Sequence, residues 1–562
     1  MDQGHFMQKF SRPVAVIGAG VSGLVTARRL VAEGFEVDVF ERRSLAGGLW
    51  NFSPAANAPF ASAVYADLRT NFPRQLMELQ DYPWTTQPLF MQHDLVREYL
   101  EGYAQEIQHE SYGLLRINFN TQVVRLLYER CAGGYWELTC KSVITGQSAT
   151  RRYPYVVVAV GVFDEPLIPS YEGLSEWKKI RENSLSHAKE YRDPKTFKGK
   201  NVLIIGYQAS GFDITNKITA YVSKLWISST QKIRHWKGKP SNVTLMTEIS
   251  CFIPETRTVH FTNGESISEV DQIILCTGYQ YHQPFIKGDN NSEAPLFPTG
   301  NSISGLHEHV ISIKQPSLAF VGLLRGAVPT FLVAQAQAAF ISRVFAGRIR
   351  LSSLTEASPQ HRMPYPKFMD YLLRLERLCE QADKGRTWQV GKAKIPAPRW
   401  TAELDLVMTR RNEIRGAFLS TGGRDDPSLK LPCHRQFLSL SCPNVEALVP
   451  FLILHYGYRR DHDTMLDFPF HCWQVGSAYR LIMRIKEMLK TMIPELGQDS
   501  QAVFVRGART LLPAILNKWL VFYRSLSDEV AIMKEHKDMD KAKIALQEIE
   551  SYFKTLGFGS SN

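Results

Sequence analysis

The glycine-rich turn at residues 18–23, G-A-G-V-S-G, constrains the fold of this chain more than any other feature. A short apolar run at 14–17 precedes the turn, and apolar residues recur at helical spacing over 24–32 after it. A second strand is expected at 37–40. This order predicts a strand, a helix and a second strand, as in a parallel sheet covered by helices. A turn of the form G-x-G-x-x-G at this place is typical of a dinucleotide-binding domain.

Each position of this first glycine turn has an expected role. Gly18 allows the tight bend, Gly20 lets the backbone approach a pyrophosphate, and Gly23 lets the helix pack closely on the strand. Ser22, inside the turn, is also predicted to contact the cofactor, whose phosphates the positive end of the helix dipole would attract. Glu41 ends the second strand, where its carboxylate can accept hydrogen bonds from ribose hydroxyls and would repel a 2′-phosphate. The site therefore favours FAD or NAD over NADP.

A second strand and turn of the same kind begins at 202–205, where an apolar run leads into residues 206–211, G-Y-Q-A-S-G. Gln208 stands at the position of the middle glycine. The segment after the next strand carries hydroxyls and an arginine but no acidic residue, which favours NADPH over NADH. The predicted contacts with this second cofactor are Gly206, Tyr207, Gln208, Ser210, Gly211, Ser228, Ser229 and Arg234.

Further apolar segments complete two such units. Strands are expected over 155–160, 225–228, 272–275 and 318–321, and helices over 211–223, 329–346 and 365–385. Segments 474–492 and 527–556 also have helical patterns, whereas 394–398 and 421–432 read as linkers. The predicted fold class is α/β, with two Rossmann-like dinucleotide-binding domains and a mainly helical C-terminal region.

Composition and charge exclude several classes of protein. With 562 residues, 44% of them hydrophobic and 22% charged, the chain is globular rather than disordered or fibrous. The net charge of +11, from 66 basic and 55 acidic residues, is scattered, so nucleic-acid binding is not expected. There is neither an apolar run of about eighteen residues nor an apolar signal core at the N-terminus, so we expect no transmembrane segment.

The cysteines indicate neither disulfides nor a metal site. None of the eight cysteines forms a C-x-x-C pair, so we expect a reducing, cytoplasmic location and no dithiol reductase activity. Cysteine and histidine are frequent between 433 and 472, but their spacing matches no common zinc pattern. The sequence therefore predicts no metal.

Several motifs resemble those of the flavin-containing monooxygenases, which are class B flavoprotein oxygenases. That family carries F-x-G-x-x-x-H-x-x-x-Y/F before its second glycine turn. This chain keeps His187 and Tyr191 but has Arg181 and Asn183 at the first two positions. Other segments similar to the family are 68–73 (L-R-T-N-F-P), 81–83 (D-Y-P), 276–279 (C-T-G-Y), 315–322 and 335–338.

The resemblance implies FAD in the first unit and NADPH in the second. It implies a discontinuous FAD-binding domain at 1–165 and 301–352, an NADPH-binding domain at 166–300 and a C-terminal extension at 353–562. The loop G-G-L-W would run along the FAD ribityl chain. The cofactor contacts that the resemblance adds are Gly48, Leu49, Trp50, Thr70, Asn71, Val123, Thr277 and Gln337.

The resemblance also implies a reaction. NADPH reduces FAD, the reduced flavin reacts with dioxygen to give a C4a-hydroperoxide, and a nucleophilic nitrogen or sulfur attacks the distal oxygen. Asn71 would stabilise the peroxide, because an amide donates and accepts hydrogen bonds without titrating. His187 is expected to fix loops rather than transfer protons, and Arg325 could face either substrate or solvent. The expected partners are a small-molecule substrate and dioxygen, and the sequence leaves open whether the protein forms a homo-oligomer.

The sequence is compatible with three alternative functions. Baeyer–Villiger relatives usually carry tryptophan at the position of Tyr191, so the tyrosine favours nitrogen or sulfur oxygenation over oxygen insertion beside a ketone. Arg181, Asn183 and Gln208 also fit a catalytically impaired flavin-binding homologue. The long C-terminal region resembles oxygenases of fungal specialised metabolism. The sequence indicates neither the substrate nor the role of that region.

Overall fold

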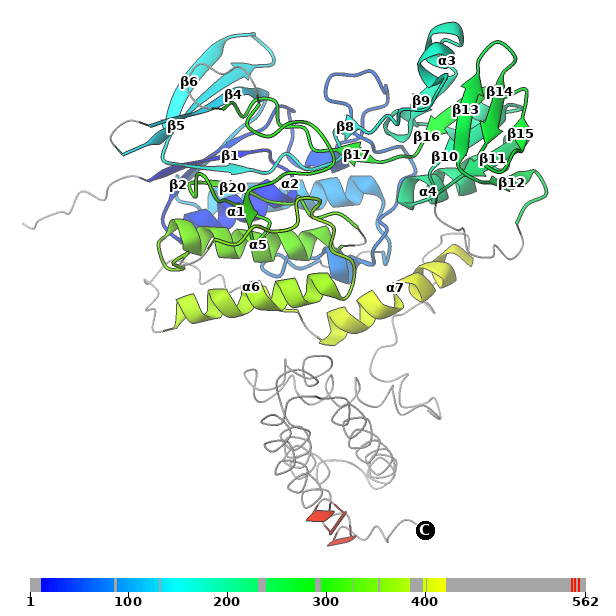
Figure 1. Cartoon of the computed structure of the whole chain (residues 1–562). Coiled ribbons are helices and arrows are strands. Elements are labelled where there is room, and N and C mark those ends of the chain that lie inside the picture. The colour runs from blue at the N-terminus through cyan, green and yellow to red at the C-terminus, as the bar shows by residue number, and fades with distance from the viewer. Residues whose placement is uncertain are drawn as a thin grey trace, which may run out of the picture. The chain divides into compact units, whose positions relative to one another are not determined.

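The computed structural model describes residues 12–420, apart from 85–87, 131–132, 231–238, 289–294, 327, 352–353, 385–397 and 401, together with 547–548, 550–551 and 554–555 (Figure 1). The chain forms two compact units, Met1–Trp400 and Thr401–Asn562. In the second unit the described part includes α7 (Ala402–Ser420). The predictions for 421–432, 433–472 and 474–492, and most of those for 394–398 and 527–556, lie outside the described residues.

The first sheet has seven strands in the order β18-β19-β20-β7-β1-β2-β3. Five of them, from β20 to β3, are parallel, and β18 and β19 pair antiparallel at one edge. The bounds are β1 (Pro13–Ile17), β2 (Glu36–Phe40), β3 (Leu115–Asn118), β7 (Tyr155–Val158), β18 (Leu306–His307), β19 (Ile311–Ser312) and β20 (Leu318–Phe320). The parallel strands β1, β2, β7 and β20 are almost wholly buried, as expected when both faces of a sheet are covered, whereas the edge strand β3 is mostly half-buried or exposed.

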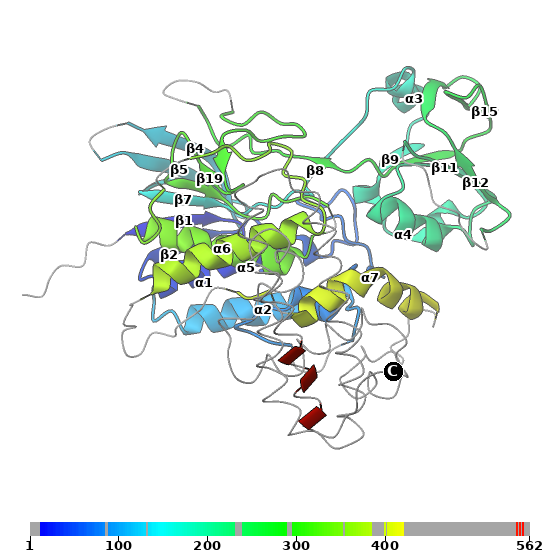
Figure 2. The same ribbon diagram turned by 60° about the horizontal axis from the view of Figure 1, so that its bottom comes forward.

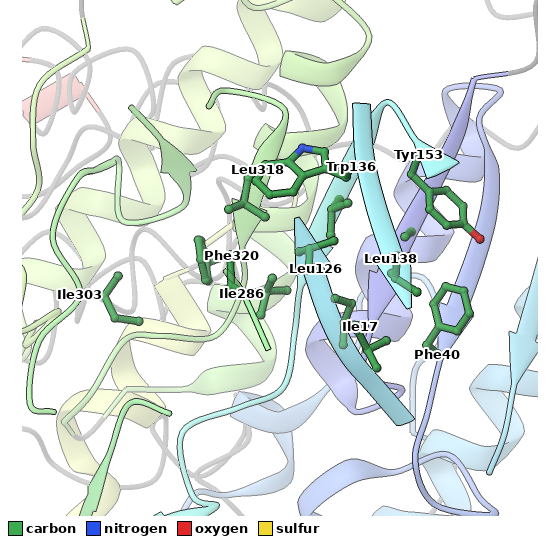
Figure 3. Packing of buried hydrophobic residues seen from close by; sticks show 14 of the residues in the cluster. Ile17, Phe40, Leu126, Trp136, Leu138, Tyr153, Ile286, Ile303, Leu318 and Phe320 are labelled. Atoms are coloured by element: carbon green, nitrogen blue, oxygen red, sulfur yellow. The ribbon is translucent and has the colours of Figure 1, made fainter. Parts of the chain in front are cut away.

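Helices cover one face of this sheet and an antiparallel meander covers the other (Figure 1). The helices are α1 (Val21–Ala32), α2 (His93–His109) and α5 (Thr330–Phe345), and the meander consists of β4 (Thr121–Glu129), β5 (Tyr135–Ser142) and β6 (Ser148–Tyr153). Between the meander and the sheet lies a core that includes Ile17, Phe40, Leu126, Trp136 and Phe320 (Figure 3). The sequence analysis did not predict the meander: β6 is almost wholly exposed and β4 alternates irregularly, although β5 alternates regularly between buried and half-buried residues.

The second sheet repeats this plan with five parallel strands in the order β12-β11-β10-β16-β9. The strands are β9 (Leu185–His187), β10 (Asn201–Ile205), β11 (Lys224–Ser228), β12 (Val243–Met246) and β16 (Gln272–Leu275). With them lie α3 (Leu174–Ile180), α4 (Ala209–Ile218) and a meander of β13 (Ile249–Ile253), β14 (Thr258–Phe261) and β15 (Ser266–Ile267). Two parallel sheets, each with its own helices and meander, confirm the predicted fold class of two Rossmann-like domains. The exact domain boundaries stay a prediction.

The chain crosses between the two sheets along one narrow ribbon. β8 (Glu165–Pro166), on the way to the second sheet, pairs antiparallel with β17 (Tyr279–Gln280) on the way back. The N–H of Leu167 donates to the carbonyl of Gly278 at 2.9 Å, which extends the pairing by one residue. The short 3₁₀ helices are η1 (Gly48–Trp50), η2 (Arg74–Met77), η3 (Ala188–Glu190) and η4 (Pro194–Phe197).

The helix after the second glycine turn is shorter than its pattern predicts. α4 ends at Ile218, whereas the prediction ran to residue 223. The N–H of Gly199 donates to the carbonyl of Tyr221, and the N–H of Ser223 donates to the carbonyl of Lys200, both at 2.9 Å. These bonds turn the chain towards the start of β11 and so compete with continuation of the helix.

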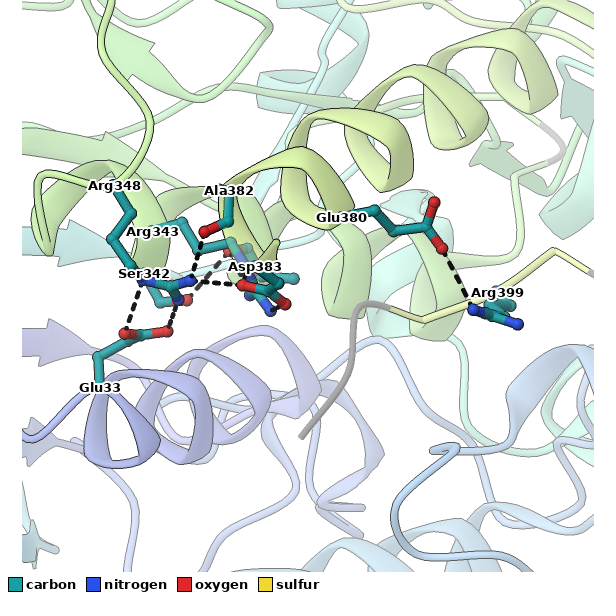
Figure 4. A network of polar contacts seen from close by, with 9 residues as sticks. Glu33, Ser342, Arg343, Arg348, Glu380, Ala382, Asp383 and Arg399 are labelled. Carbon is teal, nitrogen blue, oxygen red and sulfur yellow. Dashed lines mark hydrogen bonds and ion pairs between the residues drawn. The ribbon is translucent and has the colours of Figure 1, made fainter. Parts of the chain in front are cut away.

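α6 (Lys367–Asp383) belongs to the first compact unit, although the prediction placed it in the C-terminal extension. It runs beside α5, as Figure 2 shows, and α5 in turn contacts α1. At its C-terminal end Asp383 binds the buried guanidinium of Arg343 at 2.6 Å and also pairs with Arg348, which pairs with Glu33 after α1 (Figure 4). Burial raises the pKa of Asp383, but these arginines outweigh it and leave the pKa lowered. The network joins the ends of α1, α5 and α6.

None of the helices in the described part of the chain is both long and apolar enough to cross a membrane.

Candidate functional site

The first glycine turn is held between strand and helix so tightly that two of its positions admit only glycine. Gly18 has a φ of +107°, and a Cβ there would lie 2.6 Å from the carbonyl oxygen of Ala159. A Cβ on Gly23 would lie 1.8 Å from the carbonyl oxygen of Gly18. The N–H of Gly18 donates to the carbonyl of Phe40 at 2.8 Å. The start of α1 therefore rests directly on the ends of β1, β2 and β7.

The loop that contains Gly47 and Gly48 lies against this turn. The N–H of Gly47 donates to the carbonyl of Ala19 at 3.0 Å. A Cβ on Gly48 would lie 2.8 Å from the Cα of Gly20, so the two backbones pass at a separation that leaves no room for a side chain. Leu49 and Trp50 follow in η1 and are half-buried. The structure thus brings the predicted ribityl loop and the predicted pyrophosphate turn together.

Glu41 supports the same turn from the end of β2. Its buried carboxylate accepts hydrogen bonds from the N–H of Ala19 at 2.8 Å and the N–H of Arg43 at 2.9 Å. The guanidinium of Arg43 donates to the carbonyls of Gly48 and Phe60. The acidic group expected to bind ribose therefore lies beside the turn and also fixes its backbone, which a carboxylate can do because each oxygen accepts more than one hydrogen bond.

The second glycine turn repeats the first almost atom for atom. Gly206 has a φ of +96°, and a Cβ there would lie 2.5 Å from the carbonyl oxygen of Cys276. A Cβ on Gly211 would lie 2.1 Å from the carbonyl oxygen of Gly206. The N–H of Gly206 donates to the carbonyl of Ser228 at 2.8 Å. The replacement of the middle glycine has therefore not altered the turn.

Gln208 occupies that middle position without strain. Its φ of −91° and ψ of −154° are extended values that any residue adopts, and they resemble those of Gly20, −79° and −178°. Gln208 is exposed, whereas Gly20 is covered by the loop of Gly48. In the first turn the loop of Gly48 lies next to this position, 3.5 Å from where a Cβ on Gly20 would be, whereas the second turn presents the same position to solvent.

Both turns fit the phosphates of a dinucleotide. α1 begins at Val21 and α4 at Ala209, and in the described structure neither helix has a side-chain cap or an acidic residue in its first turn. Their first N–H groups are therefore free of side-chain acceptors, and the positive ends of both helix dipoles face the turns. Ser210, in the first turn of α4, is exposed, and Tyr207 is half-buried, with its ring 5.9 Å from that of Phe212.

The predicted 2′-phosphate contacts are placed only in part. Ser228 is buried, and its hydroxyl donates to the carbonyl of Thr247 at 2.7 Å, so its side chain ties β11 to the segment after β12. Ser229 is half-buried at the end of the same strand. Arg234 lies outside the described residues. Binding of the 2′-phosphate by these residues stays a prediction.

Asn71 is exposed, in a turn that the hydrogen bonds of the neighbouring Thr70 hold in place. Thr70 is buried, its N–H donates to the carbonyl of Met91 at 2.9 Å, and its hydroxyl accepts from the N–H of Met91 at 3.1 Å. Pro73 then caps η2. This arrangement leaves the Asn71 amide accessible to a bound molecule.

His187 is buried, and both of its ring nitrogens form hydrogen bonds with the backbone. Its Nδ1 accepts from the N–H of Lys189 at 3.1 Å, and its Nε2 donates to the carbonyl of Gly278 at 3.0 Å. Burial lowers the pKa of His187 to about 4, so the ring is neutral at pH 7. These contacts support the expectation that His187 fixes loops, here the end of β9 against the crossover ribbon.

The remaining predicted contacts have structural partners in the described chain. Gln337 is buried, its Oε1 accepts from the N–H of Gly322 at 3.0 Å, and its Nε2 donates to the hydroxyl of Tyr371 at 3.1 Å. Gly322 in turn approaches Ser22 so closely that a Cβ would lie 2.6 Å from the Ser22 Oγ. Gln337 thus positions the backbone beside the first turn. Its direct contact with a cofactor stays a prediction.

Thr277 and Val123 also lie within the folded framework. The hydroxyl of Thr277 donates to the carbonyl of Leu167 in the crossover ribbon. Val123 packs in the core beside the meander, next to a bulge that turns Val124 outward. Direct contact of either residue with a cofactor stays a prediction.

The sequence patterns did not identify Asp164, a charged residue at the point where the chain passes from the first sheet to the second. Asp164 lies just before β8 and pairs with Arg42 at 2.9 Å and with Lys189 at 3.1 Å. It joins the residue after Glu41 to the segment after β9. Although burial raises the pKa of Asp164, its two cationic partners leave that pKa lowered. No local pattern marks such a residue, because its partners are distant in the sequence.

Comparison with known proteins agrees with this geometry. A family model described as Flavin-binding monooxygenase-like matches residues 11–256. The flavin-containing monooxygenase FMO GS-OX4 of Arabidopsis thaliana is 31% identical over 417 residues, which are 70% of this chain and 84% of the relative. Senecionine N-oxygenase of Tyria jacobaeae is 30% identical over 60% of this chain and 73% of its own length.

Two solved structures resemble the described fold. S-allyl-L-cysteine S-oxygenase from Allium sativum has a TM-score of 0.59 at 25% identity and covers 78% of this chain and 98% of its own. Tmm from Pelagibacter sp. strain HTCC7211 has a TM-score of 0.55 at 22% identity, covering 72% and 90%, which bears on the fold alone. The comparisons confirm the predicted use of FAD and NADPH, and the chain belongs to the flavin-containing monooxygenase family.

Proposed function

We propose that this protein is an NADPH- and FAD-dependent monooxygenase that oxygenates a nucleophilic nitrogen or sulfur of a small molecule, through the C4a-hydroperoxyflavin that the resemblance implies. The observation that carries the proposal is the pair of equivalent glycine turns at Gly18 and Gly206, each against the start of a helix. Relatives named as an N-oxygenase and an S-oxygenase support oxygenation of these elements. Tyr191, in place of the tryptophan of Baeyer–Villiger relatives, supports the same choice.

In this proposal the protein binds and orients its cofactors and protects the reacting oxygen. The turn at Gly18 and Gly20 would hold the FAD pyrophosphate, with Glu41 at the ribose, and the turn at Gly206 would hold that of NADPH. FAD supplies the redox and oxygen chemistry when bound. The Asn71 amide can hydrogen-bond an oxygen as donor and acceptor at every pH of interest.

His187 is not proposed as an acid or base. A group transferring protons near pH 7 needs a pKa near that value and a free nitrogen. The pKa of His187 is lowered to about 4, and both of its nitrogens have backbone partners. The uncharged amide of Asn71 therefore stays the proposed polar contact with the reacting oxygen.

Product analysis tests the proposal. The FAD-loaded protein is mixed with NADPH, oxygen and a panel of an amine, a thioether and a ketone, and the products are identified by mass spectrometry. We expect an N-oxide or a sulfoxide with one NADPH oxidised per product. An ester or lactone from the ketone alone would establish Baeyer–Villiger oxygenation instead. Bound FAD that NADPH does not bleach would establish the impaired homologue.

A cytoplasmic location is part of this proposal. The described cysteines Cys140, Cys251, Cys276 and Cys379 are all free thiols. Burial raises the pKa of Cys276 and of Cys379 to about 12, so neither is poised as a thiolate. Free, unreactive thiols fit a reducing compartment.

A further inference from the structure

The segment at residues 62–68, which precedes Asn71 in the sequence, packs against the core of the second sheet. Tyr65 is 5% exposed and lies in the hydrophobic cluster that contains Val202, Ile204 and Ile214 of β10 and α4. Leu68 packs against the same cluster. The predicted boundaries assign this segment to the FAD-binding domain, so its side chains cross from one dinucleotide-binding unit to the other.

Polar contacts fasten the same segment to α4. The hydroxyl of Tyr65 donates to the carboxylate of Asp213, in the second turn of α4. The ammonium of Lys217, one turn further, binds the carboxylate of Asp67 at 2.6 Å and lies 5.5 Å from the centre of the Tyr65 ring. Two hydrogen-bonded pairs one helical turn apart fix both the position and the direction of the segment along α4.

The segment is also held from the side of the H-x-x-x-Y motif. The ring of Tyr191 meets that of Tyr65 edge to face at 4.9 Å. The guanidinium of Arg192 donates to the carbonyl of Ser53 at 2.8 Å and to that of Ser62 at 3.1 Å. The segment therefore has partners both on α4 and on Tyr191 and Arg192, which follow η3.

We propose that Tyr65 and Asp213 are positioning residues that hold the Asn71 turn in register with the helix at the NADPH pyrophosphate. The proposal rests on the proposed function. Only two residues separate Leu68, at the end of the anchored segment, from Asn71. The carbonyl of Leu68 accepts from the N–H of His93 at 3.1 Å, and Thr70 binds Met91, so the turn has little freedom of its own.

The physical consequence is coupling between the two cofactor sites. The phosphates of NADP⁺ would bind at the N-terminus of α4, and Asp213 lies only a few residues into that helix. A change in the position or rigidity of α4 therefore reaches the Asn71 turn through Tyr65. Without this connection, Asn71 would keep its local bonds but lose its register with bound NADP⁺.

Two conservative substitutions test the proposal. Tyr65→Phe keeps the ring in the core and removes the hydroxyl, and Asp213→Asn keeps the shape and removes the charge. We expect FAD content and the anaerobic rate of flavin reduction by NADPH to stay within about twofold of the wild type. We expect hydrogen peroxide released per NADPH to rise about tenfold or more, the change in an equilibrium that loss of one hydrogen bond to a charged group produces.

Amide hydrogen exchange supplies a readout that does not depend on turnover. In the FAD-loaded wild type, added NADP⁺ should slow exchange both in a peptide covering 206–218 and in one covering 62–73. In both variants we expect NADP⁺ to protect the first peptide and not the second. A role that is merely structural would lower stability and leave this difference between the peptides unchanged.

Arg257→Gln is the matched control. It removes the ion pair between Arg257 and Asp271, which has the same 2.6 Å length as the Lys217–Asp67 pair and lies in the second dinucleotide-binding domain, away from the segment that carries Tyr65. Asp67→Asn, at a more exposed pair, is a milder second test if either core variant folds poorly. We expect the control to behave as the wild type and Asp67→Asn to show a smaller loss of coupling.

The outcomes separate this inference from the proposed function. If the wild type oxidises NADPH but oxygenates no amine or thioether, the proposed function fails, whereas protection of 62–73 by NADP⁺ and its loss in the variants would still support the coupling. If the wild type forms product and the variants keep both its peroxide yield and its protection of 62–73, the positioning role of Tyr65 and Asp213 is wrong.

Discussion

At the scale of single residues, the shape of the first glycine turn depends on close contacts between backbone segments. Gly48 meets Gly20 where a Cβ on Gly48 would lie 2.8 Å from the Cα of Gly20, so a side chain on Gly48 would have to displace the turn. Glu41 and Arg43 fasten the same loops through hydrogen bonds to main-chain groups. The residues that would bind the cofactor thus also build the turn that binds it, so substitutions here act on folding and binding together.

Asn71→Ala tests the proposed contact with the reacting oxygen. The amide is exposed in a turn fixed by Thr70, so its removal should leave the fold and the reduction of FAD by NADPH unchanged. We expect product formation to fall by about a hundredfold, a typical loss for one hydrogen-bond donor to a reacting oxygen, with hydrogen peroxide released instead. Asn263→Ala, in the turn between β14 and β15, is the control. Unchanged product yield in Asn71→Ala would refute the assignment.

Gly48→Ala tests whether the close approach to Gly20 matters for FAD. The new Cβ would lie 2.8 Å from a backbone atom, which cannot move aside as a flexible side chain can. We expect the Kd for FAD, measured by flavin fluorescence, to rise about tenfold or more, in keeping with an overpacking cost of about 1–3 kcal/mol.

Gly199→Ala separates steric conflict from backbone strain. Gly199 also has a positive φ, +73°, but no described atom lies within 4 Å of its Cβ position. This control should lose about 1–2 kcal/mol of folding stability from left-handed backbone alone and keep the affinity for FAD. Equal losses of FAD affinity in the two variants would mean that strain, not the contact with Gly20, is responsible.

At the scale of elements, the two strand–turn–helix units are local structures that their sequences predict well. Apolar runs at 14–17 and 202–205 form the expected strands, because buried parallel strands favour side chains that are apolar on both faces, and the strand expected at 37–40 forms with Asp38 buried against Arg116 and Tyr153. The patterns could not show that Gly48 packs on Gly20 or that Tyr65 lies in the second core. Those contacts depend on how distant segments meet, and nothing local in the sequence records them.

The two turns should therefore respond differently to the same exchange. Gln208→Gly should change the Kd for NADPH by no more than about twofold and cost about 0.5–1 kcal/mol of stability, since its backbone is already extended and its side chain is exposed. Gly20→Gln should abolish FAD binding, because its side chain would meet the loop of Gly48. Flavin absorbance and NADPH fluorescence measure the two affinities. A loss of NADPH affinity in Gln208→Gly as large as the loss of FAD affinity in Gly20→Gln would contradict this account.

At the scale of the whole molecule, buried neutral histidines join parts of the chain that are distant in sequence. His187 links the end of β9 to the crossover ribbon through Gly278. His361 donates to the carbonyl of Ile303, and its Nδ1 lies 2.8 Å from that of His309. Burial lowers the pKa of His187 and of His361 to about 4, and a neighbouring histidine contributes for His361.

These histidines predict how stability depends on pH. Between pH 6.5 and about 4 the unfolded chain binds protons on them that the folded chain does not, so the free energy of unfolding must fall as the pH falls through this range. Above pH 6.5 both states are neutral at these sites and the effect vanishes. The loss for each histidine can reach on the order of 3 kcal/mol. Urea unfolding of the FAD-loaded protein at a series of pH values measures it.

His187→Gln isolates one of these contributions. Glutamine can donate and accept hydrogen bonds but does not titrate, so the variant should be less stable than the wild type at pH 7.5 and should lose less stability between pH 6.5 and 4. His260→Gln, at a half-buried histidine of β14 outside these contacts, is the control. If His187→Gln loses as much stability on acidification as the wild type, protonation of other groups governs the acid sensitivity of the fold, and His187 contributes only its hydrogen bonds.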